Sequence, residues 1–181
     1  DPMVRITLLL WHLEHQRETP WELVNIAVDD QHPAVTAVAN AALGRWSAVA
    51  THDIDEVSKL GFHGLSWLVN SASHASDADA DSFLLAVAGS IQRTAGELAA
   101  RSLVFRHRNS PAVMIPLLKS RSYKAALSTL LSEPPPELEN WLMSLLAESH
   151  PGDTDLMTGL GEVGTHRALN TLEPLARDHH Q

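Results

Sequence analysis

The sequence predicts an all-α fold, and three observations point to it. Alanine and leucine dominate the apolar residues while β-branched residues are sparse, a mixture that favours helix over strand. Apolar residues recur at helical spacing, as at Ile6, Leu9, Leu10 and Leu13, and no segment alternates long enough for a half-buried strand. Proline and glycine fall between the apolar stripes. We therefore expect a single helical domain over residues 1–181.

Turn and capping residues divide the chain into ten or eleven expected helices. Thr19-Pro20, His32-Pro33 and Ser110-Pro111 each place proline at an expected first helical residue, where its missing N–H costs nothing. Residues 74–80 are small and polar and predict a loop, and residues 132–136 end in three prolines that predict a stiff linker. The expected helices span residues 3–17, 20–29, 33–49, 53–60, 62–73, 79–101, 111–119, 122–132, 137–149, 154–163 and 166–178.

The lengths of these helices and connections predict how they pack. Asp53, Asp81 and Asp153 stand at expected N-caps or first turns, where a carboxylate favours the helix start. Short connections make successive helices antiparallel. Because a short helix pair cannot bury its apolar face alone, we expect the pairs to stack on one another.

Several segments resemble a known repeat. Residues 35–44 (VTAVANAALG) resemble the V-R-x-x-A-x-x-A-L-G line that opens the first helix of a HEAT-like repeat, and residues 123–132 are a looser copy. Residues 115–120 (IPLLKS) resemble the I-P-x-L-L-x-x opening of a second helix. Residues 160–169 (LGEVGTHRAL) are similar to the L-G-x-x-G-D-P-R-A-L turn of bilin-lyase-type HEAT repeats, with Thr165-His166 in place of Asp-Pro.

The resemblance covers residues 20–46 and 111–178 and fades over residues 50–105. It implies a HEAT/armadillo-like α-α superhelix of stacked antiparallel helix pairs, right-handed and used mainly as a binding surface. It implies no particular ligand, since one fold serves many functions. The 160–169 turn also leaves a bilin-lyase-like enzyme as a third hypothesis.

Composition narrows the possible functions. The net charge of −9 argues against general affinity for nucleic acid or anionic membranes, though a local patch remains compatible with it. The absence of cysteine excludes disulfides, thiolate catalysis and Cys-ligated zinc. No apolar run approaches the ~20 residues of a membrane span, and no signal-peptide pattern is present. We expect a cytoplasmic location and, from the first and last residues, a piece of a longer protein.

No arrangement of residues predicts a catalytic, cofactor-binding or metal site. His12 and His15 share a helix face, yet they lack the H-E-x-x-H spacing and a third ligand. Residues 77–81 alternate Asp with Ala, but Ser82 replaces the glycine of a calcium loop and Ala88 its bidentate glutamate. Glycine-rich phosphate-binding motifs are missing. We therefore expect no cofactor, and a non-catalytic function is favoured over an enzyme.

One stretch has an unusual charge pattern. Residues 98–132 contain no acid, and they hold six of the thirteen Lys and Arg residues of the chain. These candidate partner-binding residues are Arg101, Arg106, Arg108, Lys119, Arg121 and Lys124. We expect residues 106–108 in a loop and residues 119–121 in a turn, where they could form one patch facing an acidic protein segment, a nucleic-acid backbone or a lipid headgroup. The alternative is that they pair with acids of neighbouring helices, such as Glu97, Glu133 and Glu137.

The tryptophans offer a second set of candidate contacts. Trp46 and Trp141 lie on apolar stripes and are expected in the core. Trp21 and Trp67 are possible surface anchors, because Trp is enriched at binding hot spots, but a place in the core or in packing between helices is favoured for each. Trp11 lies with Val4 and Leu8 on a second stripe of the first helix, which is then either buried on two sides or in contact with a neighbouring module.

These observations favour a non-catalytic protein-interaction or scaffold module. Its expected partner is a protein, or another module of its own chain. The alternative is binding of a nucleic-acid backbone through the basic residues of 101–124, for which a steep loss of affinity with salt is diagnostic.

Overall fold

The computed structural model describes residues 1–15, 20–148 and 153–178. Over these residues it contains thirteen α-helices and no strand, so the predicted all-α class is confirmed. The helices are α1 (Pro2–His15), α2 (Trp21–Val28), α3 (Pro33–Ala42), α4 (Trp46–Ala50), α5 (Ile54–Ser58), α6 (Gly61–His74), α7 (Ala78–Gly89), α8 (Arg93–His107), α9 (Pro111–Leu118), α10 (Tyr123–Ser132), α11 (Leu138–Glu148), α12 (Thr154–Val163) and α13 (His166–Asp178). The ends expected at residues 17 and 149 lie outside the described residues.

The expected helix over residues 33–49 is two helices, so the predicted number of helices is too low. Helix α3 ends at Ala42, and Gly44 adopts a φ of 70°, which an L-residue with a side chain rarely takes. The Gly44 N–H donates to Ala41 O at 3.0 Å and the Arg45 N–H donates to Asn40 O at 2.8 Å. This pair of bonds is a Schellman motif, which ends α3 and turns the chain into α4.

The expected helix over residues 79–101 is also divided. Ser90 is extended, with a ψ of 171°, and its Oγ donates to Val87 O at 2.8 Å and accepts from the Gln92 N–H at 3.3 Å. A serine hydroxyl thus replaces helical backbone bonds at the end of α7. Helix α8 then continues to His107, so the prediction that residues 106–108 form a loop is wrong for Arg106 and His107. The helix continues because buried Leu103 and Val104 extend its apolar face.

Most predicted helix starts are confirmed. Pro33 and Pro111 occupy the first turns of α3 and α9. Asp53 and Asp153 cap α5 and α12, each accepting a backbone N–H two residues later. Asp81 lies in the first turn of α7, as expected for an acid near a helix start.

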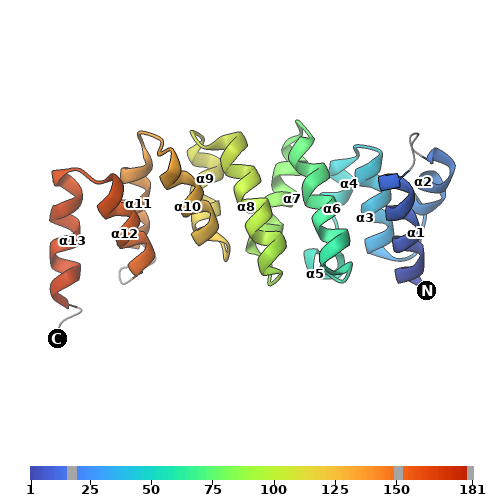
Figure 1. The fold of residues 1–181 in the computed structure, drawn as a ribbon, viewed down its shortest axis with the longest axis horizontal. Coiled ribbons are helices and arrows are strands. Elements are labelled where there is room, and N and C mark those ends of the chain that lie inside the picture. The colour runs from blue at the N-terminus through green and yellow to red at the C-terminus, as the bar shows by residue number, and fades with distance from the viewer. Residues whose placement is uncertain (16–19, 149–152, 179–181) are drawn as a thin grey trace.

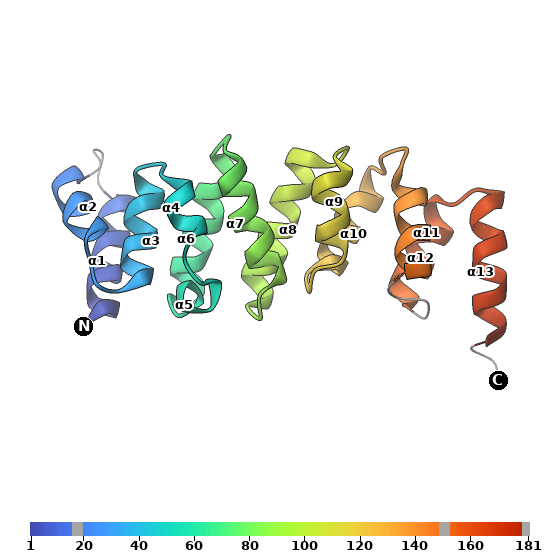
Figure 2. The ribbon, with the colours of Figure 1, turned by 180° about the vertical axis from the view of Figure 1, so that it is seen from behind.

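The helices form an elongated array, with the first helices at one end and α13 at the other (Figure 1). Helices α1, α6, α8, α10 and α12 make one row in which each contacts the next. The opposite side, seen in Figure 2, carries α3, α4, α7 and α9, which also contact one another in order. Contacts between the rows join near neighbours in the chain, such as α6 with α7 and α7 with α8. The fold is therefore built from local contacts along one long axis.

The core runs through the whole array between the two rows. It is densest at α7 and α8, where Leu84, Ala99 and Leu103 are completely buried. Trp46 and Trp141 are 3% and 6% exposed, which confirms their predicted place in the core. Burying such side chains is the main favourable contribution to the stability of a fold of this kind.

The last three helices join the rest of the array mainly where α12 packs on α10. Polar contacts span this junction. The Tyr123 hydroxyl donates to Asp153 Oδ2 at 2.7 Å and lies 3.3 Å from Asp155 Oδ2, and the Lys124 ammonium lies 2.5 Å from Asp155 Oδ2. The beginning of α10 is thereby tied to the beginning of α12.

Candidate partner-binding surfaces

The structure places the six predicted basic residues between α8 and the start of α10. Arg101 lies in the middle of α8, Arg106 in its last turn and Arg108 just after it. Lys119 and Arg121 lie in the turn between α9 and α10, as predicted, and Lys124 lies in the first turn of α10. Arg101, Lys119, Arg121 and Lys124 are exposed, whereas Arg106 and Arg108 are half-buried.

Arg106 has a structural role. Its guanidinium donates to the carbonyl oxygens of Ala72 at 2.9 Å and Ala75 at 2.6 Å, at the end of α6. It also lies 2.9 Å from Asp81 Oδ1 of α7, and His107 Nε2 lies 2.7 Å from Asp81 Oδ2. Arg106 adds a second donor to the Ala72 carbonyl, which also accepts from the Ala75 N–H at 3.1 Å, and it binds the Ala75 carbonyl. Its guanidinium thus closes the end of α6, where carbonyl groups run out of partners within the helix.

Three further basic residues pair with carboxylates of other segments. Arg108 pairs with Glu133, which follows α10, and this is one of the acids that the sequence suggested. Lys119 lies 3.4 Å from Glu148 of α11, and Lys124 pairs with Asp155 of α12. Exposed pairs of this kind contribute about 0–1 kcal/mol each, but they neutralise charge that a ligand would otherwise meet.

Arg101 and Arg121 remain the two cations of the predicted set with no carboxylate partner among the described residues. Glu97, proposed as a partner, pairs instead with Arg93 of its own helix at 2.9 Å. Distance along the chain explains which pairs the sequence missed. Asp81 and Glu148 lie about 25 or more residues from their partners, and only packing of the helices brings them together.

The contacts at the α10–α12 junction shift two pKa values. Burial raises the pKa of the Tyr123 hydroxyl far above its ordinary value, and its hydrogen bond to Asp153 acts in the same direction. The hydrogen bond from Lys124 to Asp155 raises the pKa of the Lys124 ammonium. Both groups therefore keep their protons throughout the physiological range. Sequence reasoning missed this cluster because its acids and its phenol are about 30 residues apart.

A second candidate surface lies on α1 and α2, at one end of the array. Val4, Leu8 and Trp11, the predicted second stripe of α1, are 56%, 51% and 52% exposed. Ile26 of α2 is 77% exposed. The stripe is thus a solvent-facing apolar surface opposite the buried face of α1. A cluster of exposed large apolar side chains is typical of a protein-interaction site.

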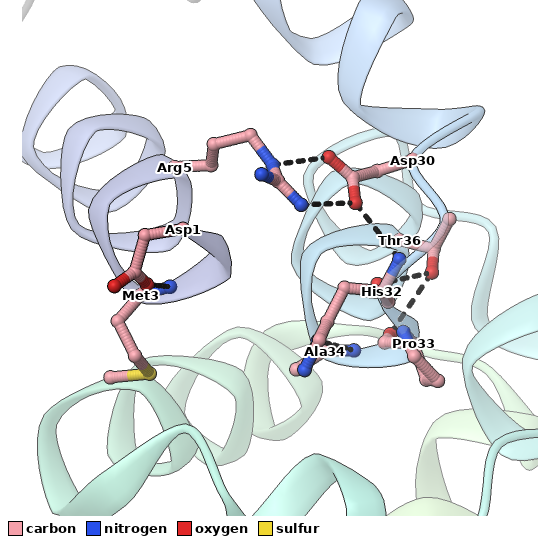
Figure 3. Close-up of polar contacts among 8 residues, drawn as sticks. All are labelled: Asp1, Met3, Arg5, Asp30, His32, Pro33, Ala34 and Thr36. Atoms are coloured by element: carbon pink, nitrogen blue, oxygen red, sulfur yellow. Dashed lines mark hydrogen bonds and ion pairs between the residues drawn. The ribbon is translucent and has the colours of Figure 1, made fainter.

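A shallow cavity of about 190 Å³ lies within this surface, between α1 and α2. Its walls are mainly apolar and include Leu8, Leu23 and Ile26. One edge is formed by Arg5, whose Nε donates to Asp30 Oδ2 at 2.6 Å and whose second nitrogen donates to Asp30 Oδ1 at 3.0 Å (Figure 3). The hydrogen bond from Arg5 lowers the pKa of the Asp30 carboxyl, although partial burial opposes the shift.

Besides Trp11, one further tryptophan adds to the exposed apolar area at this end of the molecule. Trp11 stacks on His15, one turn further along α1, with ring centroids 5.3 Å apart. Trp21, at the start of α2, is 54% exposed, so the favoured prediction of a core or packing position is wrong for this residue and the surface alternative describes it. Trp67 is half-buried in α6. The exposed tryptophans are therefore those of the first two helices.

In the part of the chain that the structure describes, no three His, Asp or Glu side chains converge in a way that could hold a metal ion. None of the described helices combines the length and the apolar character needed to cross a bilayer. Comparisons with models of protein families, with curated proteins and with solved structures found no match.

Proposed function

We propose that the chain is a HEAT-like protein-interaction module: a single domain whose antiparallel helix pairs stack into an α-α superhelix that binds a protein partner without catalysis. The two rows of helices, each contacting its neighbours in order, support the repeat interpretation. The exposed apolar stripe of α1 is the observation that carries the binding proposal. The partner is a separate protein or another module of the same chain.

The partner segment that suits this stripe is a helix. Val4, Leu8 and Trp11 follow the spacing i, i+4, i+7, which is how one helix presents a face to another. The opposite face of α1 packs on α3 in this way through Ile6, Leu9 and similar residues. A partner helix on the outer face would repeat that packing, with Leu8 and Ile26 at the cavity as central contacts.

The basic residues predicted to contact a partner remain part of the proposal in a narrower form. Arg101 and Arg121 are exposed and have no carboxylate partner among the described residues, so they are free to meet acidic groups. Arg106 is bound to α6 and α7, and the other three are paired with carboxylates. Because four of the six basic residues are already engaged, the structure does not favour binding of a nucleic-acid backbone through residues 101–124. That function stays the alternative.

The test is a photo-crosslinking experiment on the apolar stripe. A crosslinking amino acid replaces Leu8 in one sample and Phe105 of α8 in the control; Phe105 is 72% exposed and belongs to another part of the array. The samples are irradiated in extract with and without nuclease treatment, and the captured protein is identified and purified. We expect a protein that crosslinks to position 8 and not to position 105.

The purified partner is then titrated against Leu8→Lys and Phe105→Lys variants. Loss of a central apolar contact costs about 2 kcal/mol or more, which corresponds to a roughly 30-fold loss of affinity for Leu8→Lys. The Phe105→Lys variant should bind as the wild type does. Equal binding by all three proteins would refute the apolar stripe as the interface, and capture that disappears with nuclease would favour the nucleic-acid alternative.

A further inference from the structure

Helix α8 carries an exposed stripe of its own, in the middle of the array and separate from the stripe of α1 (Figure 1). The members of this α8 stripe are Thr94, Leu98, Arg101 and Phe105, all of them exposed. They follow the spacing i, i+4, i+7, i+11, which places them along one face of the helix. The other faces of α8 pack on α6, α7 and α10, so the stripe is the side of α8 that these helices leave open.

The apolar members of the stripe are aligned rather than scattered. Leu98 is 40% exposed and Phe105 is 72% exposed, and the two lie two turns apart on the same face. Ile91, which is 68% exposed, precedes the first turn of α8 and adds apolar surface at that end. A single exposed apolar side chain is ordinary, whereas several along one helix are typical of a contact with another protein.

Two arginines that lack carboxylate partners accompany the stripe. Arg101 stands between Leu98 and Phe105 in the sequence of the stripe. Arg121 lines a cavity of about 380 Å³ together with Ile91, at the beginning of α8. Neither arginine forms an ion pair with a carboxylate in the part of the chain that the structure describes. Positive charge without a partner therefore lies at the middle of the stripe and near its first end.

Acids are scarce around the stripe, although the whole chain carries a net charge of −9. Helices α6, α9 and α10, which pack on α8, contain no Asp or Glu. The one acid of α8 is Glu97, which Arg93 holds at 2.9 Å. Helix α7 has its acids in its first turn, where Asp81 is engaged by Arg106. The α8 stripe is thus an apolar face with positive charge on an otherwise acidic molecule.

This combination favours a partner helix that carries acids. A guanidinium binds both oxygens of a carboxylate at once, and apolar neighbours that exclude water strengthen such a pair. A helix packed on the stripe would place its own apolar side chains over Leu98 and Phe105, as one helix does on another. Two cations are too few to hold a nucleic-acid strand against the negative charge of the rest of the chain.

We propose that the α8 stripe binds an amphipathic helix of a protein partner, whose acidic side chains pair with Arg101 and Arg121. The stripe from Thr94 to Phe105 is about 17 Å long at 1.5 Å per residue, so a partner helix of about three to four turns covers it. The inference rests on the proposed function in one respect, because it uses the two arginines that remain free to meet acidic groups. It does not require that the α1 stripe also binds a partner.

The test selects ligands from a displayed library of helical peptides about five turns long, in which the apolar face is leucine and the other positions are random. Peptides that bind the Phe105→Lys variant are removed first, and the remainder are selected on the wild type. We expect the enriched peptides to carry an excess of Glu and Asp beside the apolar face. Enrichment without this excess would overturn the proposal, and so would failure to recover any peptide that distinguishes the two proteins.

A selected peptide is then titrated by fluorescence anisotropy against variants at exposed positions, each checked for folding by circular dichroism. We expect Phe105→Lys to lose about 30-fold in affinity, and Arg101→Glu and Arg121→Glu to lose about tenfold each. Arg45→Glu is the matched control for charge, because Arg45 is exposed at the start of α4. Leu8→Lys is the control for the α1 stripe. Both controls should bind the peptide as the wild type does.

An exchange of charges identifies the contact with Arg101. Replacing the acids of the peptide by lysine, one at a time, should weaken binding to the wild type, and one of these peptides should regain affinity for Arg101→Glu. Undiminished binding by either arginine variant would overturn the acidic partner.

Two further outcomes would assign the binding elsewhere and overturn the proposal. Loss of peptide binding in Leu8→Lys would place the peptide on the α1 stripe. Self-association of the wild type that Phe105→Lys abolishes, measured by sedimentation, would make the occupant of the α8 stripe a second copy of the chain. Neither outcome refutes the proposed function, which is tested by crosslinking at position 8, so the two proposals can fail separately.

Discussion

Arg106 joins three helices through one guanidinium. It binds two carbonyl groups at the end of α6 and contacts the carboxylate of Asp81, while its side chain is only 20% exposed. Shortening it would remove the donor to the Ala75 carbonyl, one of two donors to the Ala72 carbonyl and one of the two side chains that contact Asp81, which would keep His107 at 2.7 Å. We predict that Arg106→Ala lowers the free energy of unfolding by about 2 kcal/mol, measured by urea denaturation.

Arg101→Ala is the matched control for this prediction. Arg101 lies on the same helix, is exposed and has no carboxylate partner among the described residues. Its replacement should change the free energy of unfolding by no more than about 0.5 kcal/mol. If both variants unfold at the same urea concentration, the structural role assigned to Arg106 is wrong.

Tyr123 is the only tyrosine of the chain, so its ionisation can be followed without interference. Burial and the bond to Asp153 raise its pKa above the ordinary 10.0. We predict that tyrosinate absorbance in the folded protein appears well above pH 10, and near pH 10 once urea unfolds the chain. Titration at the ordinary pH in the folded state would contradict the buried contact with Asp153.

The same shift has a consequence for stability. Between the unfolded and folded pKa values, the unfolded chain releases the phenolic proton while the folded chain keeps it. Stability from this group is therefore complete below pH 10 and declines as the pH rises further. In Tyr123→Phe this part of the alkaline decline should disappear, and the free energy of unfolding at neutral pH should fall by about 1 kcal/mol through loss of the hydrogen bonds.

At the scale of elements, glycine decides where α3 ends. Gly44 has a φ of 70° and open space around its Cα, so a substitution there strains the backbone without a collision. Gly161 lies inside α12, also in open space, but with no left-handed φ. We predict that Gly44→Ala destabilises the protein by about 1 kcal/mol, whereas Gly161→Ala stabilises it by about 0.5–1 kcal/mol.

Thermal unfolding of these two variants gives shifts of opposite sign if the assignment is right. The two variants can be compared directly, because each adds one methyl group in exposed space. Gly161 lies within α12, and Gly44 lies just after the end of α3. If Gly161→Ala lowered the stability, position 161 would be in contact with another part of the molecule and not in open space. An unaffected Gly44→Ala variant would contradict the Schellman turn.

At the scale of the whole molecule, the elongated shape is the main feature to test. A compact globule of this length has a radius of gyration of about 16 Å. The helices here follow one another along a single axis (Figure 1), so mass lies further from the centre. We predict a clearly larger radius of gyration in small-angle X-ray scattering. A value near 16 Å would mean that the two ends of the array fold back on each other.

Local patterns were enough to find most of the helices. The stripe Ile6, Leu9, Leu10 faces the core, and the second stripe with Val4 and Leu8 faces solvent. Each stripe follows from the 3.6-residue period of a helix, so it can be found in the sequence without knowing which helices pack against α1. The two missed helix breaks have weak local signals, because Gly44 and Ser90 act through backbone geometry and a single hydroxyl.

The candidate sites were less accessible to sequence reasoning. The acid-free stretch drew attention to Arg121 and Lys124, but it gave the same weight to Arg106, whose partners lie on α6 and α7. Ser122 and Gly96 approach closely, since a Cβ atom at position 96 would lie 2.5 Å from Ser122 Oγ, and the sequence pattern does not predict this contact. Arg93, at the start of α8, pairs with Glu97, whereas the sequence suggested Glu97 as a partner of the predicted basic residues.

The sequence alone determined the helical class, the core-facing stripes of the helices and the presence of a second apolar stripe on α1, because these follow from the order of apolar and polar residues within a few turns. It left open whether that second stripe is buried, and the structure shows that it is exposed. Only the tertiary structure decided which charges are paired and which arginine holds helices together. Those properties depend on distances between residues that lie about 30 positions apart, and such distances are set when helices pack rather than when they form.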